Sequence, residues 1–298
     1  MQGLIIENVS NLYRVEVKRN NQKVVYEATA RGKFKKDEIT PVVGDIVEIE
    51  IIDEENKKAV INKIEERNVY IKRPKLANVT QIIFVVSSKD PKPDLLMLDK
   101  QLAFAEYLKI ESLIVLNKTD LDSSQEFKEI KKIYEQIGYN VVETEAKRLK
   151  GISKLREYMK NNINAFSGNS GVGKSTLING IFNQDITEEG EISRKNKRGK
   201  NTTTAIKLYE VDENTYIADT PGFSTFNIGE IKSSELAQYY KEFKDNIQDC
   251  EFVGCTHIKE ENCGIKKAIE EGKINQSRYD RFCKIYKELK DEEDRKKW

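Results

Sequence analysis

A glycine-rich segment from Gly168 to Ser175 sets the tightest limit on the fold of this chain. It reads Gly-Asn-Ser-Gly-Val-Gly-Lys-Ser and matches the complete G-x-x-x-x-G-K-[ST] pattern of phosphate loops. Glycines let successive backbone N–H groups turn inward and form a nest for an anion. The pattern requires a strand before it and a helix after it, and residues 163–167 and 174–182 fit these two elements. The alternative, a glycine-rich turn that arose by chance, does not account for this context.

The loop predicts a nucleotide phosphate site within an α/β domain. Lys174 would reach the β- and γ-phosphates and serve catalysis, and the Ser175 hydroxyl would bind Mg²⁺. The N-terminus of the following helix adds a positive dipole end. The residues expected to contact the nucleotide here are Gly168, Asn169, Ser170, Gly171, Val172, Gly173, Lys174, Ser175 and Thr176.

A polar segment at 117–120, Asn-Lys-Thr-Asp, follows the apolar run 112–116 and suggests guanine recognition. The Asp120 carboxylate can accept hydrogen bonds from the ring N–H and the exocyclic amine of guanine, a pair that adenine lacks. Asn117 can fix the loop, and the stem of Lys118 can lie along the purine. A polar loop without a ligand is the alternative for Asn117, Lys118, Thr119 and Asp120. The position at the carboxyl end of a strand favours the site.

Two further segments suit a Mg²⁺ and γ-phosphate site. Asp219 can hold Mg²⁺, and the N–H of Gly222 can sense the γ-phosphate. Thr202, Thr203 and Thr204 offer hydroxyls for a Mg²⁺ ligand on a loop that a γ-phosphate would order, and the sequence does not distinguish among the three. Each segment alone is more typical of an ordinary turn or strand start. The predicted Mg²⁺ ligands are Ser175, Thr203 and Asp219.

The rest of the chain divides around this domain. The first 65 residues contain four or five short strands, near 4–6, 12–17, 24–29, 45–52 and 59–64, which favour an OB-type β-barrel. From residue 81 apolar strands alternate with helices, which predicts a parallel sheet. From residue 233 the sequence is mainly helical. We therefore expect a barrel at 1–67, an α/β domain at 68–227 and a helical domain at 228–298.

Four residues in the C-terminal part have the spacing of a metal site. Cys250, Cys255, His257 and Cys263 supply three thiolates and one imidazole, a complete tetrahedral set for structural Zn²⁺. Reduced cysteines beside a histidine are the alternative. His257 is the single histidine of the chain, which excludes mechanisms that need both a catalytic and a metal-binding histidine.

Composition limits the partners. The chain has 298 residues, with 51 Lys and Arg against 50 Asp and Glu, so its formal net charge of +1 gives no overall attraction to nucleic acid or membrane. Its longest apolar run, 82–86, is far shorter than the ~20 residues of a membrane helix. The first residues lack the pattern of a signal peptide. We expect a cytoplasmic, monomeric protein with no membrane contact.

The motifs together resemble those of translation-factor GTPases, but their order differs. Here the base motif comes before the phosphate loop, so the domain looks circularly permuted. Combined with a barrel and a Cys/Cys/His/Cys segment, the chain resembles the bacterial GTPases that depend on the small ribosomal subunit, the RsgA or YjeQ type. Supporting residues in the barrel are Arg31-Gly32-Lys33-Phe34 and Val43-Gly44-Asp45.

That resemblance implies a GTP hydrolase that binds the small (30S) ribosomal subunit and its rRNA late in assembly and is stimulated by it. It implies GTP or GDP with Mg²⁺, and one structural Zn²⁺. Where the family usually has a switch histidine, this chain has Asn201, and Phe223 follows Gly222. An amide can position water but cannot take a proton at neutral pH. We expect weak intrinsic hydrolysis; a GTP-gated RNA-binding module and a phosphate-loop kinase are the alternatives.

Overall fold

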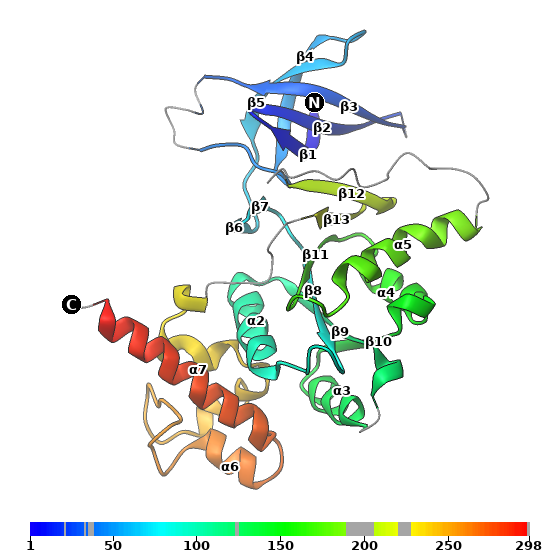
Figure 1. Cartoon of the computed structure of the whole chain (residues 1–298). Coiled ribbons are helices and arrows are strands. Elements are labelled where there is room, and N and C mark those ends of the chain that lie inside the picture. Colours follow the sequence, from blue (N-terminus) through cyan, green and yellow to red (C-terminus); the bar gives the residue numbers. More distant parts are fainter. Residues whose placement is uncertain are drawn as a thin grey trace. The chain divides into compact units, whose positions relative to one another are not determined.

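The computed structural model describes residues 1–20, 22–32, 34, 39–122, 125–188, 206–219 and 228–296 (Figure 1). The chain forms two compact units, each built from separate stretches of sequence. The first unit comprises Met1–Ile82, Ile152–Phe166 and Ser175–Phe223, and the second comprises Ile83–Gly151, Ser167–Lys174 and Ser224–Trp298.

The first unit begins with a closed five-stranded barrel. Its strands follow the order β1-β2-β3-β5-β4, and β1 also pairs with β4, which closes the ring. β3 and β5 are parallel, whereas the other pairs are antiparallel. This arrangement confirms the predicted OB-type barrel. The strands are β1 (Gln2–Val9), β2 (Leu12–Arg19), β3 (Gln22–Ala30), β4 (Ile46–Asp53) and β5 (Lys58–Ile64).

Alternating side chains fill the barrel, as period-two strands require. Val15, Val47 and Ile61 have no exposed surface, and their sequence neighbours Arg14 and Glu48 face the solvent. Asp45, fully buried before β4, accepts a hydrogen bond from the Val42 N–H at 2.8 Å. The interior is therefore apolar, and this buried carboxylate at its edge has partners.

Three further strands of the first unit lie side by side in the order β11-β13-β12. β11 is parallel to β13, and β12 is antiparallel to β13 and pairs with β1. Asn164 interrupts the apolar pattern of β11, but it is buried and its amide donates to the carbonyls of Met159 and Tyr216. The elements are β6 (Tyr70–Lys72), β7 (Lys75–Ala77), α4 (Ile152–Met159), β11 (Ile163–Ser167), α5 (Lys174–Glu188), β12 (Lys207–Asp212) and β13 (Thr215–Asp219).

The second unit carries three strands in the order β10-β9-β8. β9 and β10 are parallel, and their register sets Asn117 beside Thr144. All seven residues of β8 are buried, as a strand covered on both faces requires. The elements are β8 (Gln81–Ser87), α2 (Leu95–Leu108), β9 (Glu111–Asn117), η1 (Thr119–Leu121), α3 (Glu126–Gln136), β10 (Asn140–Thr144) and η2 (Ala146–Arg148).

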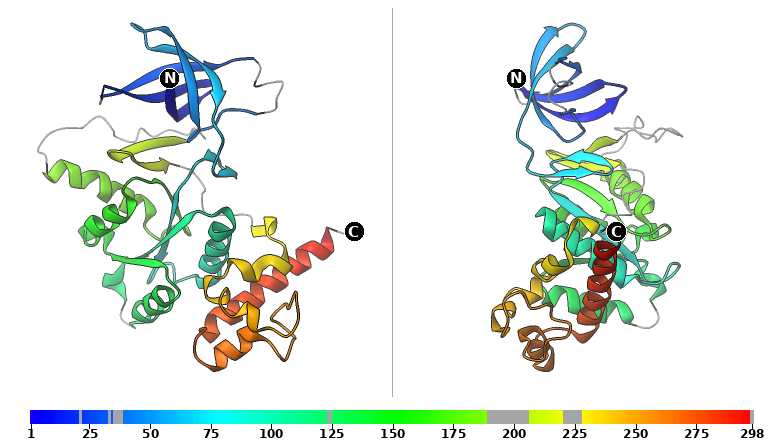
Figure 2. Two further views of the ribbon diagram at one scale, coloured as in Figure 1. Left: turned by 180° about the vertical axis from the view of Figure 1, so that it is seen from behind. Right: turned by 90° about the vertical axis from the view of Figure 1, so that its left-hand side faces the viewer.

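The C-terminal elements of this unit pack against α2, with α7 running beside it (Figure 2). The predicted helical character begins as 3₁₀ turns and becomes α-helical only after Cys263. Phe243, Phe282 and Ile285 are fully buried in the shared apolar core. The elements are η3 (Ile228–Glu230), η4 (Ser233–Tyr239), η5 (Lys241–Phe243), η6 (Ile247–Asp249), α6 (Gly264–Glu270) and α7 (Gln276–Arg295). Among the described residues, no helix combines the length and apolar character needed to cross a membrane.

Candidate nucleotide and metal sites

The phosphate loop has a backbone that only glycine permits at two positions. Gly168 has φ +141°, and an added Cβ would lie 2.4 Å from the carbonyl oxygen of Val85. Gly173 has φ +104°, and its Cβ would lie 2.2 Å from the amide nitrogen of Asn117. At both positions the loop backbone lies so close to β8 or β9 that no side chain would fit. Glycine is therefore required at these two positions by the neighbouring strands, and not only by a phosphate ligand.

Lys174 turns back over the loop that precedes it. Its ammonium donates hydrogen bonds to the carbonyl oxygens of Gly168 and Asn169, the latter at 2.9 Å. Burial lowers the pKa of Lys174 below its ordinary value. The loop thus holds a cation beside the backbone N–H groups, which is the combination that a phosphate requires.

Ser175 and Thr176 lie in the first turn of α5 and are exposed. Asp219 is the last residue of β13, and its register partner on β12 is Lys207. The other predicted residues of this site, Asn201, Thr202, Thr203 and Gly222, lie outside the described residues. Assembly of the predicted Mg²⁺ set Ser175, Thr203 and Asp219 therefore stays a prediction.

Asn117 joins the base motif to the phosphate loop and to the segment after β10. Its side-chain amide donates to the carbonyl oxygen of Val172 at 2.9 Å, inside the phosphate loop. Its carbonyl oxygen accepts from the Thr144 hydroxyl at 2.9 Å and from the Ala146 N–H at 3.2 Å. Asn117 is almost completely buried, so each of its polar atoms needs such a partner. This side chain fixes the base motif against the phosphate loop.

The other residues of the base motif follow Asn117 at the open end of β9. Lys118 has a left-handed backbone, and its ammonium donates to the carbonyls of Lys89 and Asp90. The Thr119 hydroxyl donates to the Thr144 carbonyl at 3.5 Å. Asp120 is exposed, so its carboxylate is accessible to a ligand. Lys118 and Thr119 thus hold the loop, and recognition of a base by Asp120 stays a prediction.

The segment 143–147 spans the end of β10 and contacts Asn117. Thr144 and Ala146 both bond Asn117, which places them beside the base motif. Glu145 is occupied elsewhere, because its carboxylate accepts from Arg148 and Lys150. Thr144 was not predicted as a site residue. The signal that finds it is its place at the end of the strand next to β9.

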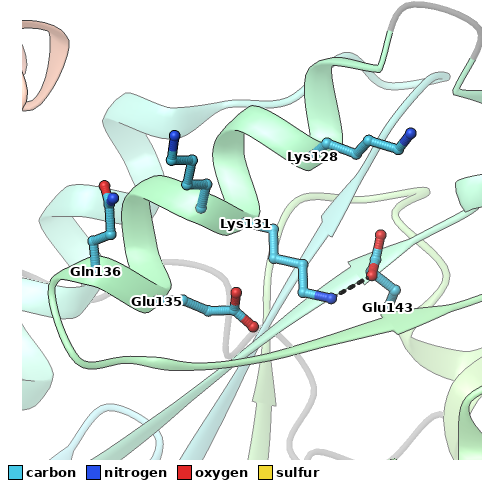
Figure 3. A pocket seen from close by; sticks show the side chains of 6 residues that line it. Lys128, Lys131, Glu135, Gln136 and Glu143 are labelled. Atoms are coloured by element: carbon cyan, nitrogen blue, oxygen red, sulfur yellow. Dashed lines mark hydrogen bonds and ion pairs between the residues drawn. The ribbon is translucent and has the colours of Figure 1, made fainter.

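A separate hollow of about 540 Å³ lies along α3 and β10 (Figure 3). Lys131 donates to Glu143 across it at 2.6 Å. Its lining contains none of the predicted site residues and mixes both signs of charge, so it does not select an anion. The lining residues are Lys128, Lys131, Lys132, Glu135, Gln136 and Glu143.

The four predicted metal ligands come together. The ligand atoms of Cys250, Cys255, His257 and Cys263 all lie within 4.8 Å of one another. The Nδ1 atom of His257 lies 3.5 Å from the Cys250 sulfur and 3.4 Å from the Cys263 sulfur. Zn–S and Zn–N bonds in a tetrahedron separate sulfur and nitrogen by about 3.5 Å. The geometry therefore fits a structural zinc ion bound through Nδ1.

Burial disfavours charge on the side chains of this cluster when no cation is bound. Burial raises the pKa of Cys255 to about 12 and raises that of Cys263, and it lowers the pKa of His257. Thiolates in such surroundings need a positive charge, which a divalent ion supplies. The His257 carbonyl accepts from the Tyr279 hydroxyl at 2.6 Å, so α7 supports the ligand loop.

Glu260 orders the loop between the last two ligands, although sequence reasoning did not single it out. One of its carboxylate oxygens accepts from the Thr256 N–H at 2.9 Å, and the other accepts from the Ile258 N–H at 3.1 Å. Burial acts against the charged form, but these bonds prevail and lower the pKa of Glu260 to about 2. A glutamate among charged residues gives no sequence signal for this role.

Comparison with known proteins identifies the family. Residues 64–229 match the RsgA GTPase family, and residues 2–61 match the RsgA N-terminal domain. The chain belongs to the RsgA GTPase family. It is 40% identical over 298 residues, the full length of both chains, to a protein of Clostridium botulinum (strain Kyoto / Type A2) named small ribosomal subunit biogenesis GTPase RsgA. A protein of that name from Alkaliphilus metalliredigens (strain QYMF) is 40% identical, with 97% of this chain and 98% of the relative covered.

Solved structures agree with the family. The crystal structure of YjeQ from Thermotoga maritima has a TM-score of 0.83 and 35% identity, and covers 97% of this chain and 98% of its own. The structure of YloQ, described as a circularly permuted GTPase, has a TM-score of 0.83 and 30% identity, and covers 98% and 95%. The prediction of a permuted GTPase with a barrel and a C-terminal Cys₃His cluster is confirmed.

Proposed function

We propose that this GTPase acts in the biogenesis of the small (30S) ribosomal subunit, which binds it and stimulates its hydrolysis of GTP. The observation that carries the proposal is full-length similarity to relatives named for this role. The described phosphate loop and base motif supply the chemistry that such a role requires, because both retain their motif residues and contact each other through Asn117.

The proposed reaction is hydrolysis of GTP to GDP and phosphate. The loop 168–176 binds the phosphates, Lys174 neutralises their charge, and residues 117–120 select guanine. Mg²⁺ would be bound by Ser175, Thr203 and Asp219, and would supply further charge at the phosphates. Asn201 would orient the attacking water, and the Gly222 N–H would contact the γ-phosphate. These roles are assigned from the motifs.

Zinc has a structural role in this proposal. Four protein ligands fill a tetrahedron and leave no open position for chemistry. We propose three domains at 1–67, 68–227 and 228–298, a monomeric state, contact with the rRNA of the small subunit and a location in the cytoplasm. Five cations at Arg194, Lys195, Lys197, Arg198 and Lys200, outside the described residues, are the proposed RNA contacts.

The test is single-turnover phosphate release by the full-length protein, with and without purified small subunits. We expect slow release alone and faster release with subunits, because Asn201 cannot act as a base. Lys174→Ala is the matched control, and it should abolish both by removing the cation at the phosphates. Co-sedimentation with small subunits should require a non-hydrolysable GTP analogue.

The rival function is a GTP-gated RNA-binding module that scarcely hydrolyses GTP, and Asn201 and Phe223 favour it. It predicts nucleotide-dependent co-sedimentation without phosphate release under either condition. Absence of binding to the subunit with the GTP analogue would instead contradict the ribosomal role. Unchanged stimulated turnover in Asn201→Ala would show that Asn201 does not position the water.

A further inference from the structure

Helix α2 contacts the phosphate loop through two polar side chains. Gln101, which is buried, donates from its amide nitrogen to the hydroxyl oxygen of Ser167 at 3.0 Å. Ser167 has no exposed surface and comes directly before Gly168. At the start of the helix, Asp94 accepts from the Asn169 amide at 3.2 Å and from the Met97 N–H at 3.0 Å. The helix therefore bonds the loop on both sides of Gly168.

The same helix is bound to the C-terminal region by a buried ion cluster. Asp99, with no exposed surface, accepts from the Tyr134 hydroxyl at 2.5 Å, from Arg278, and from Arg281 Nε at 2.5 Å. Arg278 also donates to Glu242 at 2.7 Å. The donors come from α3 and α7, so one carboxylate on α2 holds two other elements.

Arg278 keeps its charge within this cluster. Burial opposes the charge of Arg278, but the Asp99 and Glu242 carboxylates raise its pKa well above the ordinary value. The Arg278 guanidinium also lies 4.6 Å from the centre of the Tyr240 ring. A buried charge that loses one partner is strongly penalised, so α2 and α7 have one favoured arrangement.

We propose that α2 links the C-terminal zinc region to the phosphate loop, with Gln101 as the residue that positions the loop. Asp99 and Gln101 are two residues apart, which puts them on nearly opposite sides of a helix. Asp99 is thus held by α7 while Gln101 holds Ser167. Loosening α7 shifts α2 and frees the loop from its binding conformation. The inference rests on the proposed guanine-nucleotide site.

The test measures the rate at which a fluorescent GDP analogue dissociates from the full-length, zinc-loaded protein. Gln101→Ala and Ser167→Ala each remove one partner of the same buried bond, so each should raise this rate about tenfold. The double variant should be no faster than either single one, because both remove the same bond. Lys63→Ala is the control for loss of a surface charge, since Lys63 pairs with Glu65 of the barrel and belongs to neither α2 nor α7. It should leave the rate unchanged.

A further variant tests the bonds between α7 and α2. Arg281→Ala removes one donor to Asp99 and leaves Arg278 and Tyr134, so the protein should fold but release GDP several-fold faster. Hydrogen exchange should increase in residues 168–174 and stay unchanged in the barrel, residues 2–64. Unchanged dissociation in Gln101→Ala and Ser167→Ala, or additive effects in the double variant, would refute the positioning role. An unchanged rate in Arg281→Ala would refute the link, whereas failure of the parent protein to bind GDP would refute the proposed function instead.

Discussion

Five strands of the N-terminal barrel pair around a closed ring, whereas the C-terminal region at 228–296 consists of short 3₁₀ turns, α6 and α7. In the barrel, backbone groups bond one another and apolar residues such as Val15 and Ile61 fill the interior. In the C-terminal region, the Cys₃His cluster brings together side chains of the segment 250–263, and Arg278 bonds Asp99 of α2, which is distant in sequence.

The difference shows two ways to stabilise a small region of chain. A closed sheet distributes its stability over many backbone bonds and many apolar contacts, so no single side chain is essential. A region of short turns buries less regular structure and depends on a few strong cross-links. Single substitutions should therefore unfold the C-terminal region, whereas single substitutions should not unfold the barrel.

Loss of zinc should have the largest effect. Structural zinc contributes about 10–16 kcal/mol in small zinc domains, so a strong chelator or Cys263→Ala should unfold the ligand loop and expose the core of 228–296. Hydrogen exchange measured by mass spectrometry should increase there while residues 2–64 keep their protection. Equal loss of protection in the barrel would contradict the contrast between the two regions.

Removal of Arg278 should have the second largest effect on stability. Arg278→Ala leaves Asp99 and Glu242 buried without their shared partner, and should lower the free energy of unfolding by about 3–5 kcal/mol. Urea denaturation followed by circular dichroism measures this change. Arg278→Lys is the control, because it restores the charge without the planar fork and should recover only part of the loss.

The smallest effect should come from a barrel ion pair at the surface. Arg19 and Glu54 are both half exposed and lie 3.4 Å apart, so Arg19→Ala should change the free energy of unfolding by less than about 1 kcal/mol. The same denaturation experiment measures it. A loss as large as that of Arg278→Ala would show that the barrel, too, depends on single cross-links.

The sites were predictable where their residues are close in sequence. The phosphate loop and the four predicted metal ligands each lie within a short segment, so the spacing of their residues indicates the kind of site. The roles of Thr144, Gln101 and Glu260 were not predicted. Each acts through a hydrogen bond whose meaning depends on a neighbour: Thr144 through Asn117, Gln101 through Ser167, and Glu260 through the backbone between two ligands.

The elements of the fold, too, were predictable where their signal lies in neighbouring residues. Apolar alternation predicted the barrel strands, and the uninterrupted apolar run predicted β8. The 3₁₀ turns between Ser233 and Asp249 were expected as part of a helical region, because their apolar residues suit either form. Their shape depends on packing against α2, which local propensity does not express.

The sequence by itself determined the family, the barrel, the permuted order of the GTPase motifs and the four members of the Cys₃His cluster, because each follows from local spacing or from the order of motifs. Only the tertiary structure decided how Asn117 joins the base motif to the phosphate loop and how Asp99 receives arginines from a helix near the other end of the chain. Asp99 and Arg278 are 179 positions apart. No local pattern relates such residues, since their contact arises only when folding excludes water and the buried carboxylate must find its donors.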